Sequence, residues 1–221
     1  LAVVFHHYSL NGFAVNAQTI APYPLLSSLF RYGYLGVDLF FMISGFVILM
    51  TAFSGSLRHF VLSRLVRLYP AFWICCTITF VAILTIGSPD YVATFSQYLV
   101  NMSMLSGFMD VESIDNAYWS LFVELKFYAL VAIVLLLGKV QQIETLFIFW
   151  LVVTIALIIY PVFHLNFVLL DDYSAHFIAG ATFFFIWSRG MTRIRCLVIV
   201  AAWLCVLYQS TVDMYEIEIR I

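Results

Sequence analysis

The sequence predicts an all-α fold, a polytopic transmembrane helix bundle that forms a single domain over residues 1–221. Three observations predict it: 64% of the 221 residues are hydrophobic, only 10% are charged, and the mean hydropathy is +1.04. Soluble domains average about 45–50% apolar and about 25% charged residues. Because so few charges cannot keep this much apolar surface in water, a soluble domain is excluded and lipid is the predicted solvent.

Recurring apolar runs predict seven spans, since a spanning helix needs about 20 mostly apolar residues. The chain begins at Leu1 inside the first run and ends just after the last, so we expect a fragment that lacks the N- and C-terminal parts of a longer domain. The predicted spans, of which the first is a remnant, are Leu1–Asn11, Gly36–Phe53, Tyr69–Ile86, Tyr118–Gly138, Ile143–Phe163, Ser174–Ser188 and Ile194–Gln209.

A long connection, Gly87–Ala117, separates the third span from the fourth. Its middle, YVATFSQYLVNMSML, is semi-apolar and rich in aromatic residues. Such a segment can lie in the membrane interface as an amphipathic helix or re-enter the membrane. Both alternatives stay open at the level of sequence.

The positions of the basic residues predict the orientation. If the spans alternate, seven of the ten basic residues fall on one side: Arg58, Arg64, Arg67, Lys139, Arg189, Arg193 and Arg195. The opposite connections hold Arg31 and six acidic residues: Asp90, Asp110, Glu112, Asp115, Asp171 and Asp172. Because cytoplasmic loops carry an excess of Lys and Arg, the basic side is predicted to be cytoplasmic, with a bacterial inner membrane as the expected location.

Ionisable residues inside the membrane are candidates for function, because burying them is costly. His7 lies near the outer end of the first span, where it can act as a general base or be an interfacial histidine bonded to a carbonyl. Asp38 follows Gly36 at the start of the second span, where it can bind substrate or cap the first helical turn.

Glu124 lies about 9 Å inside the fourth span, six residues at 1.5 Å each. Ser120 and Tyr128 are one turn away on either side and share its face. The sequence therefore predicts either a polar substrate site at these three residues or a structural hydrogen-bond network. Lys126 points to nearly the opposite face, where it can reach the interface or pair with a group outside the chain.

Arg64 and Arg67 occur in SRLVRLYPAFW, and their i, i+3 spacing predicts one shared helical face at the cytoplasmic surface. They can anchor the protein to anionic lipids. Alternatively, they can clamp the phosphates of a nucleotide-bearing acyl donor.

Other kinds of site are not indicated. Cys75, Cys76, Cys196 and Cys205 all lie in apolar runs and are expected to be packing residues. No nucleotide-binding, zinc-protease or serine-hydrolase motif occurs in the sequence. His176 follows Asp172 at i+4, which is too little to predict a metal site, and no metal or nucleic acid is expected.

Four runs occur in the order LAVVFHHYS, YGYLGVDLFFMISGFVI, FVLSRLVRLYPAFW and NAYWSLFVELKFY. In order and spacing they resemble the membrane acyltransferase 3 family, over about residues 1–138. HFIAGATFFF, around Gly180, is similar to a later family region, more weakly. The resemblance implies acyl transfer from acyl-CoA, with acetyl-CoA expected, to a hydroxyl of a carbohydrate, a lipid-linked carbohydrate or another exported acceptor, as in O-acetylation of polysaccharides.

The resemblance also implies roles for particular residues. His7 best matches a family histidine that follows an arginine after ten residues, which places the arginine upstream of Leu1 and leaves His6 as the alternative. Glu124 matches the carboxylate of a W-S-L-x-x-E pattern, and Arg64 and Arg67 match a basic stretch that ends in Tyr-Pro. A proton-coupled transporter or flippase that uses the same histidine and glutamate is the alternative function.

Helix rise adds a prediction about depth. His7, Asp38 and Glu124 should all lie in the outer half of the bilayer, within about 10 Å of one another in depth. Lipid cannot solvate them, so His7 and Glu124 are expected to line one interior cavity, with Asp38 near its mouth. Arg64 and Arg67 are expected at the cytoplasmic end, at least half a bilayer away.

Overall fold

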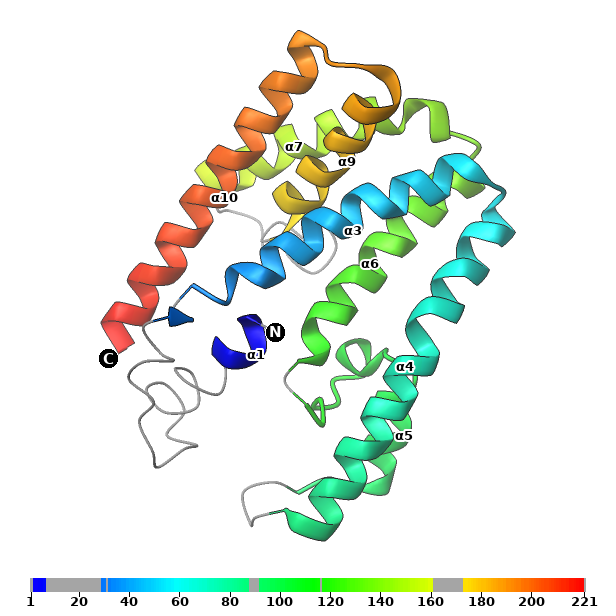
Figure 1. Cartoon of the computed structure of the whole chain (residues 1–221), viewed down its shortest axis with the longest axis vertical. Helices are drawn as coiled ribbons and strands as arrows, with labels where there is room; N and C mark the ends of the chain where they lie inside the picture. Colours follow the sequence, from blue (N-terminus) through cyan, green and yellow to red (C-terminus); the bar gives the residue numbers. More distant parts are fainter. Residues whose placement is uncertain are drawn as a thin grey trace. The chain divides into compact units, whose positions relative to one another are not determined.

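A computed structural model describes residues 2–6, 29–30, 32–87, 92–115, 117–160 and 173–220 of the chain. These ranges contain eight α-helices and no strand, which confirms the predicted all-α class (Figure 1). Five of the helices are long and apolar enough to cross a membrane. The chain divides into two compact units.

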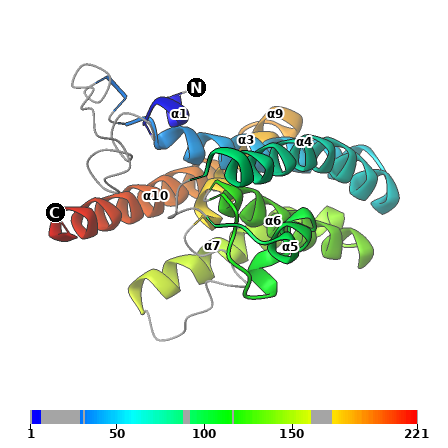
Figure 2. The same cartoon turned by 90° about the horizontal axis from the view of Figure 1, so that it is seen from below.

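Unit 1 comprises residues 1–50 and 141–221, and unit 2 comprises residues 51–140. The helices of unit 1 are α1 (Ala2–His6), α3 (Leu35–Ser54, whose last four residues belong to unit 2), α7 (Ile143–Ile159), α9 (Ser174–Arg189) and α10 (Arg193–Arg220). The helices of unit 2 are α4 (Leu57–Ile86), α5 (Phe95–Met102) and α6 (Tyr118–Leu136). Within unit 1, α9 packs against both α7 and α10. Figure 2 shows the helices from below.

Six of the seven predicted spans begin within one residue of a helix, namely those that correspond to α1, α3, α6, α7, α9 and α10. The helix of the third predicted span, α4, begins at Leu57, ahead of the predicted span start at Tyr69, and continues through Pro70. The Ser56 hydroxyl caps this helix by accepting a hydrogen bond from the backbone N–H of His59. The helix therefore includes Arg58, Arg64 and Arg67, which the sequence placed in the connection between the second and third spans.

The predicted sixth span forms a helix, but α9 has only 16 residues and is not among the five candidate spans. At 1.5 Å per residue its length is about 24 Å. It packs against both α7 and α10, and eleven of its sixteen residues are buried. A helix that is apolar on every side is expected to be surrounded by protein in this way.

Two glycines let α3 and α9 cross closely. A Cβ atom on Gly45 would come closer than 3.0 Å to the carbonyl oxygen of Phe177 and lie 3.1 Å from its Cα. A Cβ atom on Gly180 would meet the carbonyl oxygen of Met42 in the same way. Small residues at helix interfaces permit such contact between backbones in membrane proteins.

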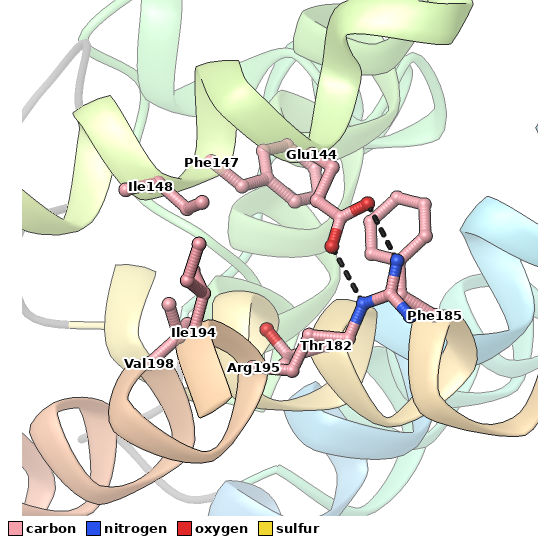
Figure 3. Close-up of a pocket in the computed structure, with 8 residues that line it drawn as sticks. All are labelled: Glu144, Phe147, Ile148, Thr182, Phe185, Ile194, Arg195 and Val198. Atoms are coloured by element: carbon pink, nitrogen blue, oxygen red, sulfur yellow. Dashed lines mark hydrogen bonds and ion pairs between the residues drawn. The ribbon is translucent and has the colours of Figure 1, made fainter. Parts of the chain in front are cut away.

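An ion-pair cluster ties α7, α9 and α10 together (Figure 3). Arg195 donates two hydrogen bonds to the Glu144 carboxylate, at 2.7 and 3.0 Å, and a third at 2.5 Å to the Gly190 carbonyl. Arg189 lies 3.7 Å from the same carboxylate, and both guanidinium groups lie over the Phe185 ring. An apolar cleft beside the cluster is lined by residues of α7, α9 and α10.

In unit 2, the segment between the third and fourth predicted spans folds against α4. The Tyr69 hydroxyl donates to the Ser103 carbonyl at 2.9 Å, and the Trp73 indole donates to the Met102 carbonyl at 3.0 Å. Asn101, which is 1% exposed, donates from its amide to the Glu112 carbonyl at 3.1 Å. A helix in this segment is thereby confirmed, and the alternatives of interfacial and re-entrant placement remain predictions.

Candidate functional site

Glu124 is buried within α6, where it is 5% exposed. Its neighbours on the buried face of the helix are Val123, Phe127, Tyr128 and Val131. The Tyr128 hydroxyl, one turn further along, interacts with both the Glu124 carboxylate and the Arg64 guanidinium. The structure therefore brings Glu124 and Tyr128 together with a charged group from α4.

Arg64 reaches this place because it lies on the inner face of α4, where it is 7% exposed. Its terminal amine donates to the Thr51 hydroxyl, and its guanidinium carbon lies 5.7 Å from the centroid of the Tyr128 ring. Phe60, one turn earlier on α4, packs edge-on against the same ring. Arg64, Tyr128 and Glu124 form a buried polar cluster between α4 and α6, which we call the α4–α6 cluster.

The predicted arrangement of the two arginines is wrong. Arg67 is exposed, whereas Arg64 is buried. Residues at i and i+3 are about 60° apart around a helix, so one can face the protein while the other faces outward. The predicted separation from Glu124 by half a bilayer is also wrong for Arg64. Its partner Tyr128 lies about 15 Å from the start of α6 and about 12 Å from its end, near the middle of the helix.

Two further residues of α6, Ser120 and Lys126, make contacts with residues close to them in the sequence. The Ser120 hydroxyl donates to the Ala117 carbonyl of its own helix at 3.0 Å. Lys126, for which the sequence offered no partner, has its ammonium group 4.5 Å from the centroid of the Phe122 ring, within cation–π range. Neither of these two contacts involves a residue of the α4–α6 cluster.

Asp38 lies in the first turn of α3, as expected for a carboxylate that favours a helix N-terminus. Its Oδ1 atom is 3.5 Å from Nε2 of His176 on α9. Sequence reasoning considered His176 only beside Asp172, which lies outside the described residues. Nothing in the local sequence links His176 to Asp38, because the contact depends on the α3–α9 crossing.

Of the two N-terminal histidines, the structure describes His6, and His7 lies outside the described residues. His6 is 8% exposed, and its Nδ1 atom lies 3.0 Å from the Phe30 carbonyl oxygen. Because a carbonyl only accepts, Nδ1 must carry the hydrogen, and Nε2 then carries the lone pair of the neutral ring. The shared cavity predicted for His7 and Glu124 stays a prediction.

The residues that the structure describes contain no group of three metal-ligating side chains. What they do contain is a buried carboxylate, phenol and guanidinium in unit 2, and an imidazole–carboxylate pair in unit 1. Buried charges persist in proteins when they are paired and hydrogen-bonded, which suits groups that must keep a defined protonation state.

The chain matches the acyltransferase domain of the acyltransferase 3 family over residues 1–217. No curated protein and no solved structure matches it. The family match covers nearly all of the 221 residues, including every helix that carries a candidate residue. This chain therefore belongs to the acyltransferase 3 family and is a membrane-bound acyltransferase.

Proposed function

We propose that this acyltransferase moves an acyl group from acyl-CoA, with acetyl-CoA as the donor, to a hydroxyl of a carbohydrate or another exported acceptor. The family supplies the reaction class and the membrane setting. The observation that carries the proposal for the site is the buried α4–α6 cluster, in which a carboxylate and a guanidinium interact with one phenol.

The reaction needs a base. As the acceptor hydroxyl attacks the thioester carbonyl, the base removes its proton, the carbon–sulfur bond breaks, and the CoA thiolate leaves and takes up a proton. We propose His7 as this base. His6 is the alternative, because the hydrogen bond from its Nδ1 to the Phe30 carbonyl fixes the tautomer whose Nε2 can accept a proton.

Glu124 is proposed as the carboxylate of the reaction. The Tyr128 hydroxyl has one hydrogen, so when it donates to Glu124 its oxygen can accept from Arg64. In this order of donors the Tyr128 hydroxyl links the Glu124 carboxylate to the Arg64 guanidinium. The carboxylate is proposed to orient the acceptor hydroxyl or the imidazole that deprotonates it.

The two arginines are proposed to contact different parts of the donor. Arg67 is exposed, as a residue that binds the phosphates of CoA must be. Arg64 is buried, and its Nε has no hydrogen-bond partner among the described residues. We propose that this nitrogen donates to the thioester carbonyl oxygen as negative charge develops there.

These roles can be tested in the full-length protein in native membranes by following CoA release and transfer of label from radiolabelled acetyl-CoA. We expect Glu124→Gln to lower the rate by about 10²–10⁴. Glu112→Gln is the matched control, because Glu112 is exposed and bonds in unit 2 through its backbone carbonyl. Equal activity of the two variants would exclude Glu124 from the reaction.

The arginines are separated by steady-state kinetics in the same assay. Arg67→Ala should raise the KM for acetyl-CoA with little change in kcat, because it removes a binding contact. Arg64→Ala should lower kcat, because it removes a contact made mainly in the transition state. The opposite pattern would reverse the two assignments, and longer acyl-CoA donors in place of acetyl-CoA test the choice of acyl chain.

A further inference from the structure

A buried imidazole in unit 1 takes no part in the chemistry proposed above. His176 is 4% exposed, and in the described part of the chain neither of its ring nitrogens makes a hydrogen bond. A neutral imidazole has one donor and one acceptor, and leaving such groups unpaired in the interior is unfavourable. A buried polar side chain in this state requires a physical explanation.

The Asp38 carboxylate lies next to this imidazole, with 3.5 Å between Nε2 and Oδ1. The two side chains differ in access: that of Asp38 is 20% exposed and that of His176 is 5% exposed. Asp38 makes a further interaction of its own. The carboxylate is therefore the accessible member of the pair, and the imidazole lies behind it.

The helix crossing fixes the position of both residues. His176 lies one turn before Gly180 on α9, and Asp38 lies one turn before Met42 on α3. Gly180 and Met42 lie where the two backbones are in close contact. If either helix slid along the other, a residue with a Cβ atom would replace a glycine where a Cβ atom has no room, so this contact holds the distance between Asp38 and His176.

The surroundings of the pair are apolar and aromatic. Phe41, three residues after Asp38 on α3, packs against Tyr173 at 4.9 Å and against Phe177 at 5.1 Å between ring centroids. The Tyr173 ring also lies 6.3 Å from the ring of His176. In such surroundings an isolated charge is unfavourable, and a proton shared between imidazole and carboxylate satisfies both groups.

We propose that His176 is a positioning residue for Asp38, and that the pair forms a binding site for a hydroxyl group of the acceptor. When the acceptor binds, the Nε2–H of His176 donates a hydrogen bond to one oxygen of the carboxylate, which lies 3.5 Å away in the free protein. The other oxygen then accepts a hydrogen bond from the acceptor hydroxyl, and no covalent bond changes in this step. The inference rests on the proposed function, because it assigns the acceptor's recognition to α3 and α9 of the same enzyme.

The kinetic test compares two substitutions of His176 in the full-length protein, with acetyl-CoA as the donor and octyl glucoside as a soluble sugar acceptor. His176→Leu removes the donor, whereas His176→Gln retains an amide donor at similar reach. Thr182→Val is the control, since Thr182 is buried in the same helix and its hydroxyl donates to the Ile178 carbonyl of that helix.

We expect His176→Leu to raise the KM for octyl glucoside by about 10- to 150-fold, the range of a hydrogen bond to a charged group. The KM for acetyl-CoA should stay unchanged, and His176→Gln should recover most of the loss. If His176→Leu instead changes both KM values alike, or matches Thr182→Val, or is not rescued by glutamine, the proposal is overturned.

A second measurement tests the interaction of His176 with Asp38 without relying on catalysis. In a double-mutant cycle of His176→Leu and Asp38→Asn, thermal unfolding of the purified full-length protein should show a loss of Tm in the double variant smaller than the sum of the single losses. Additive losses would reject the pair even if acyl transfer is intact. Coupled losses in a protein that transfers no acyl group to any sugar would uphold the pair and reject the proposed function.

Discussion

The α3–α9 crossing makes a quantitative prediction for Gly180→Ala. The new Cβ would lie 2.8 Å from the Met42 carbonyl carbon and closer still to its oxygen, whereas ordinary contacts begin at 3.4 Å. The backbones must therefore separate by at least 0.6 Å (3.4 − 2.8), and by more to clear the oxygen. Overpacking of this kind costs about 1–3 kcal/mol. For a chain of this size, with 2–4 °C per kcal/mol, the expected loss of Tm is roughly 2–12 °C.

The assay is thermal unfolding of the purified full-length protein in detergent, followed by circular dichroism. Gly36→Ala is the matched control, because the only close neighbour of its added Cβ among the described residues is a methyl group of Val3, at the end of a side chain that can move. We expect its Tm to fall by less than that of Gly180→Ala. Equal Tm values for the two variants would show that the α3–α9 contact is loose, and the argument for a backbone-fixed Asp38–His176 distance would fail with it.

Three further predictions concern other parts of the chain. Glu144→Gln should cost about 1–3 kcal/mol in thermal unfolding, because a hydrogen-bonded ion pair that is partly buried loses its charge. In intact cells, Arg193→Cys should resist an impermeant thiol reagent and Asp110→Cys should react, and the reverse pattern would invert the predicted topology. Asn101→Ala should speed amide hydrogen exchange at Ile114, whose N–H donates to the Asn101 side chain at 3.3 Å, and unchanged exchange would show that this bond is not formed.

The apolar runs predicted where helices begin far better than how they extend or what surrounds them. Apolar composition marks the start of α6 at Tyr118 and of α7 at Ile143 because both helices begin where the apolar residues begin. It failed for α4, because the Ser56 cap starts that helix among polar residues that hydropathy assigns to a loop. It also gave no sign that eleven of the sixteen residues of α9 are buried, since an apolar run looks the same in protein and in lipid.

The candidate site was predictable where it depended on one helix. The depth of Glu124 and its one-turn spacing from Tyr128 follow from helix geometry alone, and both residues are buried as that geometry suggests. The burial of Arg64 was not predictable, because the i, i+3 spacing does not determine which of two residues faces a neighbouring helix. The contact between Asp38 and His176 depends on two distant helices that cross at glycines, and sequence spacing contains no information about it.

The last prediction concerns the two N-terminal histidines, and the hydrogen bond of His6 allows a structural role to be distinguished from that of the base. The Nδ1–H of His6 donates to the Phe30 carbonyl, and asparagine can place its amide donor near that position while lacking any nitrogen equivalent to Nε2. If His6 serves the fold, His6→Asn should keep both the folded protein and acyl transfer within about threefold of the unsubstituted enzyme, while loss of the base in His7→Asn should lower the rate by about 10²–10⁴. Both variants should be measured for Tm and for transfer of label from acetyl-CoA, so that loss of folding and loss of chemistry are separated. A stable His6→Asn protein with the larger loss of rate would instead assign the base to His6, and the hydrogen bond to Phe30 would then be the contact that orients it.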